Sequence, residues 1–201
     1  MEAAPNLTVW AAIFALPLVL ALATAFTKTS VVLGALRMGF SAEALLPLPV
    51  VFALSLLVTA LVMAPTGAAM ADVLTAVGGL DALARDAEQW PAVLAPLTDF
   101  LARHSDPAER TFFAELTARS IDDPLVLVSA FVITELAEAF AIAVALLVPM
   151  VVVDLLAAQG LVLMGLAQQP TPLVTVPIKL LLFLAVGGWD LVIGGLVGGY
   201  G

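Results

Sequence analysis

The chain has 201 residues, of which 63% are hydrophobic and 11% charged, and its formal net charge is −9. A soluble globular domain is only about 45 to 50% apolar, so composition predicts a membrane-associated protein in contact with lipid. The lack of cysteine excludes disulfides, thiolate metal ligands and cysteine nucleophiles. The negative charge argues against a nucleic-acid partner, whose phosphates require a basic patch. We expect no cofactor and no metal.

Two apolar stretches make up the N-terminal region, residues 1–71. The first is expected from Val9 to Phe26, long enough to approach the roughly 30 Å hydrocarbon thickness. It is expected to be retained, because a signal peptide begins with basic residues and residues 1–8 have none. Residues 27–30 are then expected to interrupt the apolar pattern. The second stretch is expected over residues 45–63.

Prolines mark the limits of the second stretch. Pro47 and Pro49 stand at its start, where proline is tolerated because first-turn amides lack helical partners. Pro65, Thr66 and Gly67 are expected to end it.

Residues 72–123 form an acidic stretch with ten acids, four arginines and the only histidine. Asp106 is expected to cap a helix, with Pro107 at its first position and Glu109 reaching back to the cap amide. That helix is expected to be amphipathic, and Pro91–Arg103 is expected to be similar. The expected apolar side holds Phe112, Phe113 and Leu116, and the expected wet side holds Arg110, Glu115 and Arg119. The stretch is therefore predicted to face water.

Basic residues predict the orientation. Lys and Arg favour short cytoplasmic loops, and Lys28 and Arg37 follow the first apolar stretch. We expect the N-terminus outside, Lys28 to Glu43 inside, and residues 72–123 on the periplasmic side.

Residues 124–201 are apolar almost to their end, and Gln168 to Pro172 give the strongest turn signal, which predicts a helical hairpin. Glycines recur after this turn at helical spacings and predict a face for subunit packing, although glycine is also simply frequent in membrane helices. These glycines are Gly187, Gly188, Gly194, Gly195 and Gly198.

Ionisable residues lie inside or beside the apolar stretches. A charge at a helix centre costs about 2.5 to 3.5 kcal/mol on insertion scales, so these side chains are expected to face protein or water. The expected buried charges are Lys28, Arg37, Glu138, Asp154 and Asp190, together with Glu135 and Lys179.

Polar residues in a fixed order inside apolar sequence carry a resemblance to a known family. The matching blocks are Phe26 to Arg37, Phe100 to Ser105, Phe131 to Leu136, Pro149 to Leu155, and Val176 to Leu180 with Gly188-Trp189. Over roughly residues 16–200 the chain resembles the FliP/SctR family, the export-gate membrane proteins of flagellar and injectisome type III secretion.

The resemblance implies an all-α fold without enzymatic activity in the bacterial inner membrane. Bent helical hairpins of five copies are expected to form a helical cone with two smaller families of gate proteins, and unfolded secreted proteins are the expected cargo. The missing signal peptide favours the injectisome branch over the flagellar one.

The resemblance also assigns roles to single residues. Glu135 and Lys179 match the family pattern and are expected to form an ion pair across the subunit boundary, unless each is solvated in a water-filled vestibule. Asp154 also matches, with Lys28 and Arg37 as possible partners.

Three positions depart from the pattern. Glu138 stands where many relatives have lysine, and Gly187 where many have aspartate, with Asp190 one helical turn later. A methionine run expected to seal the pore is missing. Met164, Leu166 and Gln168 are expected to line the constriction instead, unless Met164 is only a packing residue.

Two other classes of protein compete with this interpretation. A secondary transporter has intramembrane charges and broken helices, but its paired segments require an internal repeat, which the sequence lacks. An intramembrane hydrolase would need Ser30 or Ser129 with Lys28 or His104. Lys28 and Ser30 are two apart and point to different sides of a helix, and no zinc-protease H-E-x-x-H motif is present.

Overall fold

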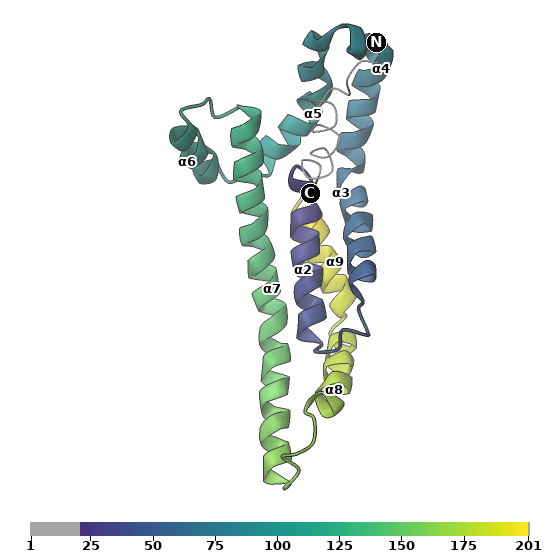
Figure 1. Cartoon of the computed structure of the whole chain (residues 1–201), viewed down its shortest axis with the longest axis vertical. Helices are drawn as coiled ribbons and strands as arrows, with labels where there is room; N and C mark the ends of the chain where they lie inside the picture. Colours follow the sequence, from purple (N-terminus) through teal and green to yellow (C-terminus); the bar gives the residue numbers. More distant parts are fainter. Residues whose placement is uncertain (1–20, 201) are drawn as a thin grey trace, which may run out of the picture. The chain divides into compact units, whose positions relative to one another are not determined.

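The structure is a computed structural model that describes residues 21–200, and over this range it contains helices and no strand. The prediction of an all-α fold is confirmed. The helices are α2 (Phe26–Gly39), α3 (Leu48–Ala76), α4 (Leu80–Arg85), the 3-10 helix η1 (Ala87–Gln89), α5 (Trp90–Arg103), α6 (Pro107–Thr117), α7 (Pro124–Leu163), α8 (Pro172–Ala185) and α9 (Gly188–Gly198) (Figure 1).

The chain forms two compact units that are discontinuous in sequence. Of the described residues, 21–27 and 60–135 belong to unit 1, and 28–59 and 136–200 belong to unit 2. The long helices α3 and α7 contribute residues to both units. Most of the predicted span Val9–Phe26 lies outside the described residues.

Within residues 21–200, two helices are long and apolar enough to cross a membrane. They are α3, with 29 residues, and α7, with 40 residues. A third span is possible if α8 and α9 form one broken crossing, since they bend by 62° at a short break. The expected hairpin is present, because α7 ends at Leu163 and α8 begins at Pro172 (Figure 1).

The predicted break in the apolar pattern at residues 27–30 lies within a helix, and the predicted helix end at Pro65 is wrong. Residues 27–30 lie inside α2, where Lys28 and Thr29 are buried and bonded to neighbouring side chains. Pro65 lies inside α3, which continues to Ala76 through a run rich in alanine. Proline removes one amide donor from a helix but does not end it when the surrounding residues favour helix.

The core of unit 1 joins α5 to the first turns of α7. Phe100 and Phe131 are buried, with ring centroids 5.6 Å apart in a tilted arrangement. Beyond them, the Asp106 backbone N–H donates to the Thr134 hydroxyl over 2.9 Å. The start of α6 is thereby tied to α7 by a hydrogen bond, while α5 packs on α7 through the two aromatic rings.

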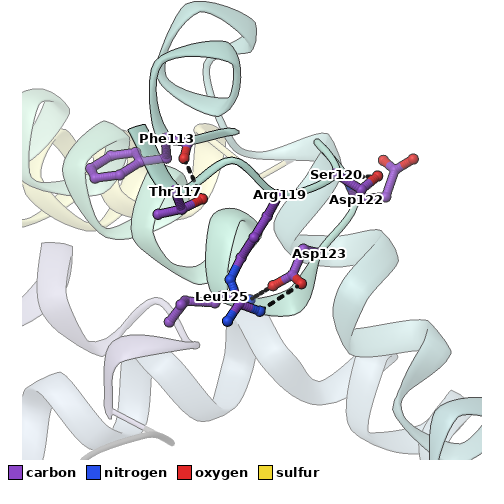
Figure 2. Close-up of polar contacts among 7 residues, drawn as sticks. All are labelled: Phe113, Thr117, Arg119, Ser120, Asp122, Asp123 and Leu125. Carbon is purple, nitrogen blue, oxygen red and sulfur yellow. Dashed lines mark hydrogen bonds and ion pairs between the residues drawn. The ribbon is translucent and has the colours of Figure 1, made fainter. Parts of the chain in front are cut away.

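The two Asp-Pro sequences of unit 1 start helices in the same way. Asp106 accepts from the Ala108 N–H over 2.7 Å, with Pro107 at the first position of α6, so the predicted cap is confirmed. Asp123 accepts from the Leu125 N–H over 2.9 Å at the start of α7, and Arg119 donates to its other oxygen (Figure 2). An aspartate side chain in these positions satisfies a helix amide that has no partner within the helix.

The second hydrogen bond of the predicted capping box, from the Asp106 backbone N–H to the Glu109 side chain, is wrong. Glu109 was expected to accept from the backbone N–H of Asp106, but that amide donates to Thr134 instead. The predicted faces of α6 also need correction. The helix buries no residue fully, Phe112 and Leu116 are exposed, and Arg110 is half-buried rather than on the wet side.

Three aromatic rings of unit 2 contact one another edge to face. Phe183 of α8 packs edge-on against Phe40, just after α2, and against Trp189 of α9, at centroid distances of 5.3 and 5.4 Å. Gly188 leaves room for the Phe183 ring, since a β-carbon on Gly188 would overlap it. The Gly188-Trp189 pair therefore has a packing role within the chain.

Candidate functional site: two buried lysines and an exposed helical turn

Lys179 of α8 lies at the centre of a polar cluster in unit 2, with a side chain that is 0% exposed. Its ammonium donates to Asp154 Oδ2 over 2.6 Å, to the Gly39 carbonyl over 2.7 Å and to Ser41 Oγ over 3.0 Å. An ammonium has three donors, so these bonds use its full capacity. We call these four residues the Lys179 cluster.

The positions of these partners follow from the local structure. Gly39 is the last residue of α2, and a cation is favourable at the carbonyl end of a helix. Ser41 has a φ of 54°, an uncommon conformation for a residue with a side chain. Lys179 therefore holds both sides of the corner that ends α2, and Asp154 attaches that corner to α7.

Lys28 of α2 is the second buried lysine, 1% exposed, and it pairs with Glu138 of α7. The Tyr200 ring lies over its ammonium, with the centroid 4.6 Å away, in the geometry of a cation–π contact. The Glu138 side chain is 51% exposed, so this pair opens to the surroundings on one side.

A hydrogen-bonded seam next to Lys28 joins α2 to α3. The Thr29 hydroxyl lies 3.4 Å from the Ser55 carbonyl and 3.3 Å from the Thr59 hydroxyl, which itself donates back to that carbonyl. Threonine and serine can bridge helices in this way without a charged group. Sequence analysis missed this seam, although hydroxyls spaced four residues apart in an apolar helix were the available signal.

Of the remaining predicted charges, Arg37 is half-buried and Asp190 is exposed. Arg37 donates to the Leu46 carbonyl and pairs with Glu43 over 2.9 Å, which holds the loop between α2 and α3. Asp190 is exposed, with its Oδ2 3.5 Å from the place of a β-carbon on Gly187. Burial of Glu138 and Asp190 in an assembly stays a prediction.

The structure gives each acid of α7 a definite place. Asp154 pairs with Lys179, and neither Lys28 nor Arg37, its suggested partners, is its partner within the chain. Glu135 is buried and belongs to unit 1. Its pairing with Lys179 across a subunit boundary stays a prediction, because a single chain contains no such boundary.

The turn between α7 and α8 is exposed on all sides. From Val162 to Val174 every residue is exposed except the half-buried Thr171, and burial resumes at Leu161 and Thr175 on either side. We call residues 162–174 the hairpin tip. It contains the three residues predicted to line the constriction, namely Met164, Leu166 and Gln168.

The hairpin tip is ordered by its own backbone. Gly165 has a φ of 76°, its N–H donates to the Val162 carbonyl, and the Leu166 N–H donates to the Leu161 carbonyl over 2.8 Å. This is the Schellman arrangement that ends a helix at glycine. Sequence analysis missed this role of Gly165, although a glycine followed by Gln-Gln-Pro was the available signal.

The glycines of the predicted packing face have different surroundings. Gly187 has a φ of 64° and Gly188 contacts Phe183, so both have reasons within the chain. A β-carbon on Gly194, Gly195 or Gly198 would meet no atom within 4 Å. Packing of these three against another subunit stays a prediction.

Comparison with known proteins gives consistent matches over nearly the whole chain. A family model described as the FliP family matches residues 9–196. The chain is 34% identical to the hypersensitivity response secretion protein HrcR of Ralstonia nicotianae, covering 100% of this chain and 98% of that protein. It is also similar to the Yop proteins translocation protein R of Yersinia pestis, with 30% identity over 92% of this chain and 91% of that one. A third relative is the flagellar biosynthetic protein FliP of Caulobacter vibrioides, with 34% identity over 90% of this chain and 70% of that protein.

Proposed function

The chain belongs to the FliP family, and we propose that copies of it form the protein-conducting gate of a type III secretion apparatus in the bacterial inner membrane. The relatives are components of secretion and flagellar export apparatuses, and this chain is a component of the same kind. In the proposed assembly five copies and smaller gate proteins surround the path of unfolded secreted proteins. The acidic residues 72–123 lie on the periplasmic side.

The length of the apolar face of α7 carries the proposal. At 1.5 Å per residue its 40 residues extend over about 60 Å, twice the roughly 30 Å hydrocarbon thickness. Exposed apolar side chains continue from Leu125 to Leu163. In the apolar 18-residue segment of this helix, only 17% of the residues are buried within the chain. Lipid can cover only about half of this face, so other protein chains are needed for the rest.

The exposed charge of unit 2 fits the same assembly. Glu138 is half-exposed on α7, a helix whose other exposed side chains include many large apolar ones. An ionised group facing hydrocarbon is costly, whereas a neighbouring subunit or a water-filled path can solvate it.

Native mass measurement tests the proposal directly. The full chain, purified with its membrane partners in mild detergent, should run as a complex with several copies and with smaller membrane proteins of the apparatus. Secretion of cargo should be lost when the gene is deleted and restored when it is returned. A chain that stays monomeric and without partners, in a host that secretes normally when it is deleted, would contradict the proposal.

The hairpin tip is the proposed constriction. Met164, Leu166 and Gln168 are exposed there, and flexible apolar side chains can close around cargo of varied shape. Replacing all three by glycine should raise small-ion leak through the purified complex in vesicles. Replacing the equally exposed Leu57 of α3 by glycine is the matched control and should leave the leak unchanged. Unchanged permeability in the triple variant would count against a seal at the tip.

A Glu135–Lys179 pair between neighbouring copies is part of the same proposal. Lys179 already donates to three acceptors in its own chain, so an intersubunit pair has to replace one of these bonds. Charge reversal at each position, and at both together, tests whether the pair forms, with assembly and secretion as the measurements. If the double reversal restores neither assembly nor secretion, the pair does not form.

A further inference from the structure

We infer that Lys179 is a positioning residue, which fixes the base of the α7–α8 hairpin to the corner after α2 and so sets where the hairpin tip lies. The inference rests on the proposed constriction for its functional meaning, but its geometry stands on unit 2 alone. All four residues of the Lys179 cluster belong to this unit.

The hairpin tip has few packed neighbours that could position it, and those are at its base, where Thr171 is half-buried and borders a pocket with Ser41 and Asp154. Burial ends at Leu161 on α7 and resumes at Thr175 on α8, so the tip projects beyond the core of unit 2. Segments with few buried contacts have low local stability and move readily. The position of the tip therefore depends on the last fixed contacts below it.

The tip is internally stiff, so it moves as one body. The Schellman bonds of Gly165 and Leu166 close its α7 side, and Pro170 and Pro172 restrict the backbone on its α8 side. The Gln169 N–H donates to the Leu166 carbonyl and completes the turn. The stiff hairpin tip therefore changes position when the end of α7 and the start of α8 change position.

The Lys179 cluster fixes the end of α7 and the start of α8 at similar distances from the hairpin tip. Asp154 lies ten residues before Met164, about 15 Å along α7, and Lys179 lies eight residues after Thr171, about 12 Å along α8. The ammonium joins these two helices to each other and, through Gly39 and Ser41, to α2. Lys179 is thus the one cluster member that contacts all three segments.

The cluster differs from an ordinary buried ion pair because the lysine has two neutral acceptors besides its carboxylate. Removing both charges relieves the cost of an uncompensated charge, as is known for buried pairs replaced by apolar residues. It cannot restore the bonds to the Gly39 carbonyl and Ser41. Stability and tip position should therefore respond differently to the same substitutions.

Distance measurement between two spin labels tests the inference in the full chain. The sequence has no cysteine, so Gln168→Cys on the tip and Met38→Cys on the exposed side of α2 are the only labelling sites. Labelled chains are diluted with unlabelled ones so that a single copy is observed. The parent should give a narrow distance distribution, and Lys179→Met and Asp154→Asn should each shift and broaden it.

The double variant Lys179→Met with Asp154→Leu separates positioning from stability. It should recover thermal stability relative to Asp154→Asn, while the distance distribution stays broad. Glu43→Gln is the matched control, because it breaks the exposed Arg37–Glu43 pair on the loop that follows the same corner. This control should leave the distribution narrow.

The distance measurement can fail independently of the ion-leak test of the proposed constriction. An unchanged distribution in Lys179→Met and Asp154→Asn overturns the positioning role. If neither variant accumulates, Ser41→Ala removes a single bond of the cluster and should broaden the distribution, and an unchanged distribution there overturns the role equally. A shifted distribution without increased ion leak would leave the positioning role intact and contradict the constriction at the tip.

Discussion

The two units hold their charged side chains in opposite ways. In unit 1 the Arg119–Asp123 pair joins positions four apart at the surface, with 52% of the arginine side chain exposed. In unit 2 the lysines Lys28 and Lys179 are almost fully buried, and each reaches a carboxylate on α7 that is distant in sequence. Unit 1 places this pair at the surface, although it also buries Glu135, whereas unit 2 brings helices together around its two buried lysines.

The difference teaches where a charge matters for the fold. An exposed pair gains little, because water solvates its members almost as well when they are apart. A buried lysine has already lost its water, so the carboxylate and the neutral acceptors that replace it become necessary. The acidic composition of residues 72–123 is therefore compatible with many sequences, while Lys28 and Lys179 each require specific partners.

Breaking the Lys179–Asp154 pair should have the largest effect on stability. Asp154→Asn leaves the buried ammonium uncompensated and should lower the free energy of unfolding by about 3 to 5 kcal/mol. The measurement is unfolding of the detergent-solubilised chain, alongside Arg119→Met as the surface counterpart in unit 1. The comparison between the units fails if both variants lose the same amount.

Glycine substitution sharpens the comparison between surfaces within unit 2. Gly188→Ala places a methyl group against the Phe183 ring and should cost about 1 to 3 kcal/mol through overpacking. Gly194→Ala meets open space in the single chain, so it should leave the unfolding of the monomer unchanged or slightly improved.

Assembly gives the second readout for Gly194. If the glycine face packs against a neighbouring subunit, the added methyl group should weaken the oligomer in native mass measurement without harming the monomer. An oligomer of normal stability would contradict the predicted packing face.

Substitution of two buried threonines of unit 2 by valine should change the free energy of unfolding in opposite directions. Thr175 is fully buried and its hydroxyl has no hydrogen-bond partner among residues 21–200, whereas the Thr29 hydroxyl is bonded in the seam to α3. Thr175→Val should raise the free energy of unfolding by about 1 kcal/mol, since it removes an unsatisfied group. Thr29→Val should lower it by about the same amount. If Thr175→Val is destabilising, a water molecule or a neighbouring chain satisfies its hydroxyl.

Much of the fold could be predicted from the sequence, because the signals were local. The all-α class followed from composition and family resemblance, and the Asp106-Pro107 start and the turn before Pro172 followed from residues adjacent in sequence. Helix continuation could not be predicted locally. Residues 27–30 and Pro65 look like breaks until the partners that satisfy their polar groups are known.

The candidate site was predicted only as a set of residues. The cost of buried charge identified Lys28, Asp154 and Lys179, but not which acid each lysine contacts. Pairing depends on the rotation of helices distant in sequence, which no spacing rule determines. The acceptors at Gly39 and Ser41 were beyond sequence analysis for the same reason, since a backbone carbonyl and a loop conformation leave no charge pattern.

Acid titration of Asp123, in the surface pair of unit 1, should have the smallest effect on thermal stability. The Leu125 backbone N–H, and secondly the Arg119 guanidinium, hold the pKa of Asp123 below its ordinary value of 3.8. A carboxyl group with a lowered pKa in the folded state stabilises the fold above its ordinary pKa, and this contribution is lost as the pH falls through the folded value. Asp123→Asn keeps an acceptor for the helix cap but cannot titrate. The parent should therefore be slightly more stable to heat than Asp123→Asn near neutral pH, and this difference should shrink on acidification below about pH 4. Identical acid profiles for the two proteins would show that the cap and the surface pair do not favour the ionised carboxylate.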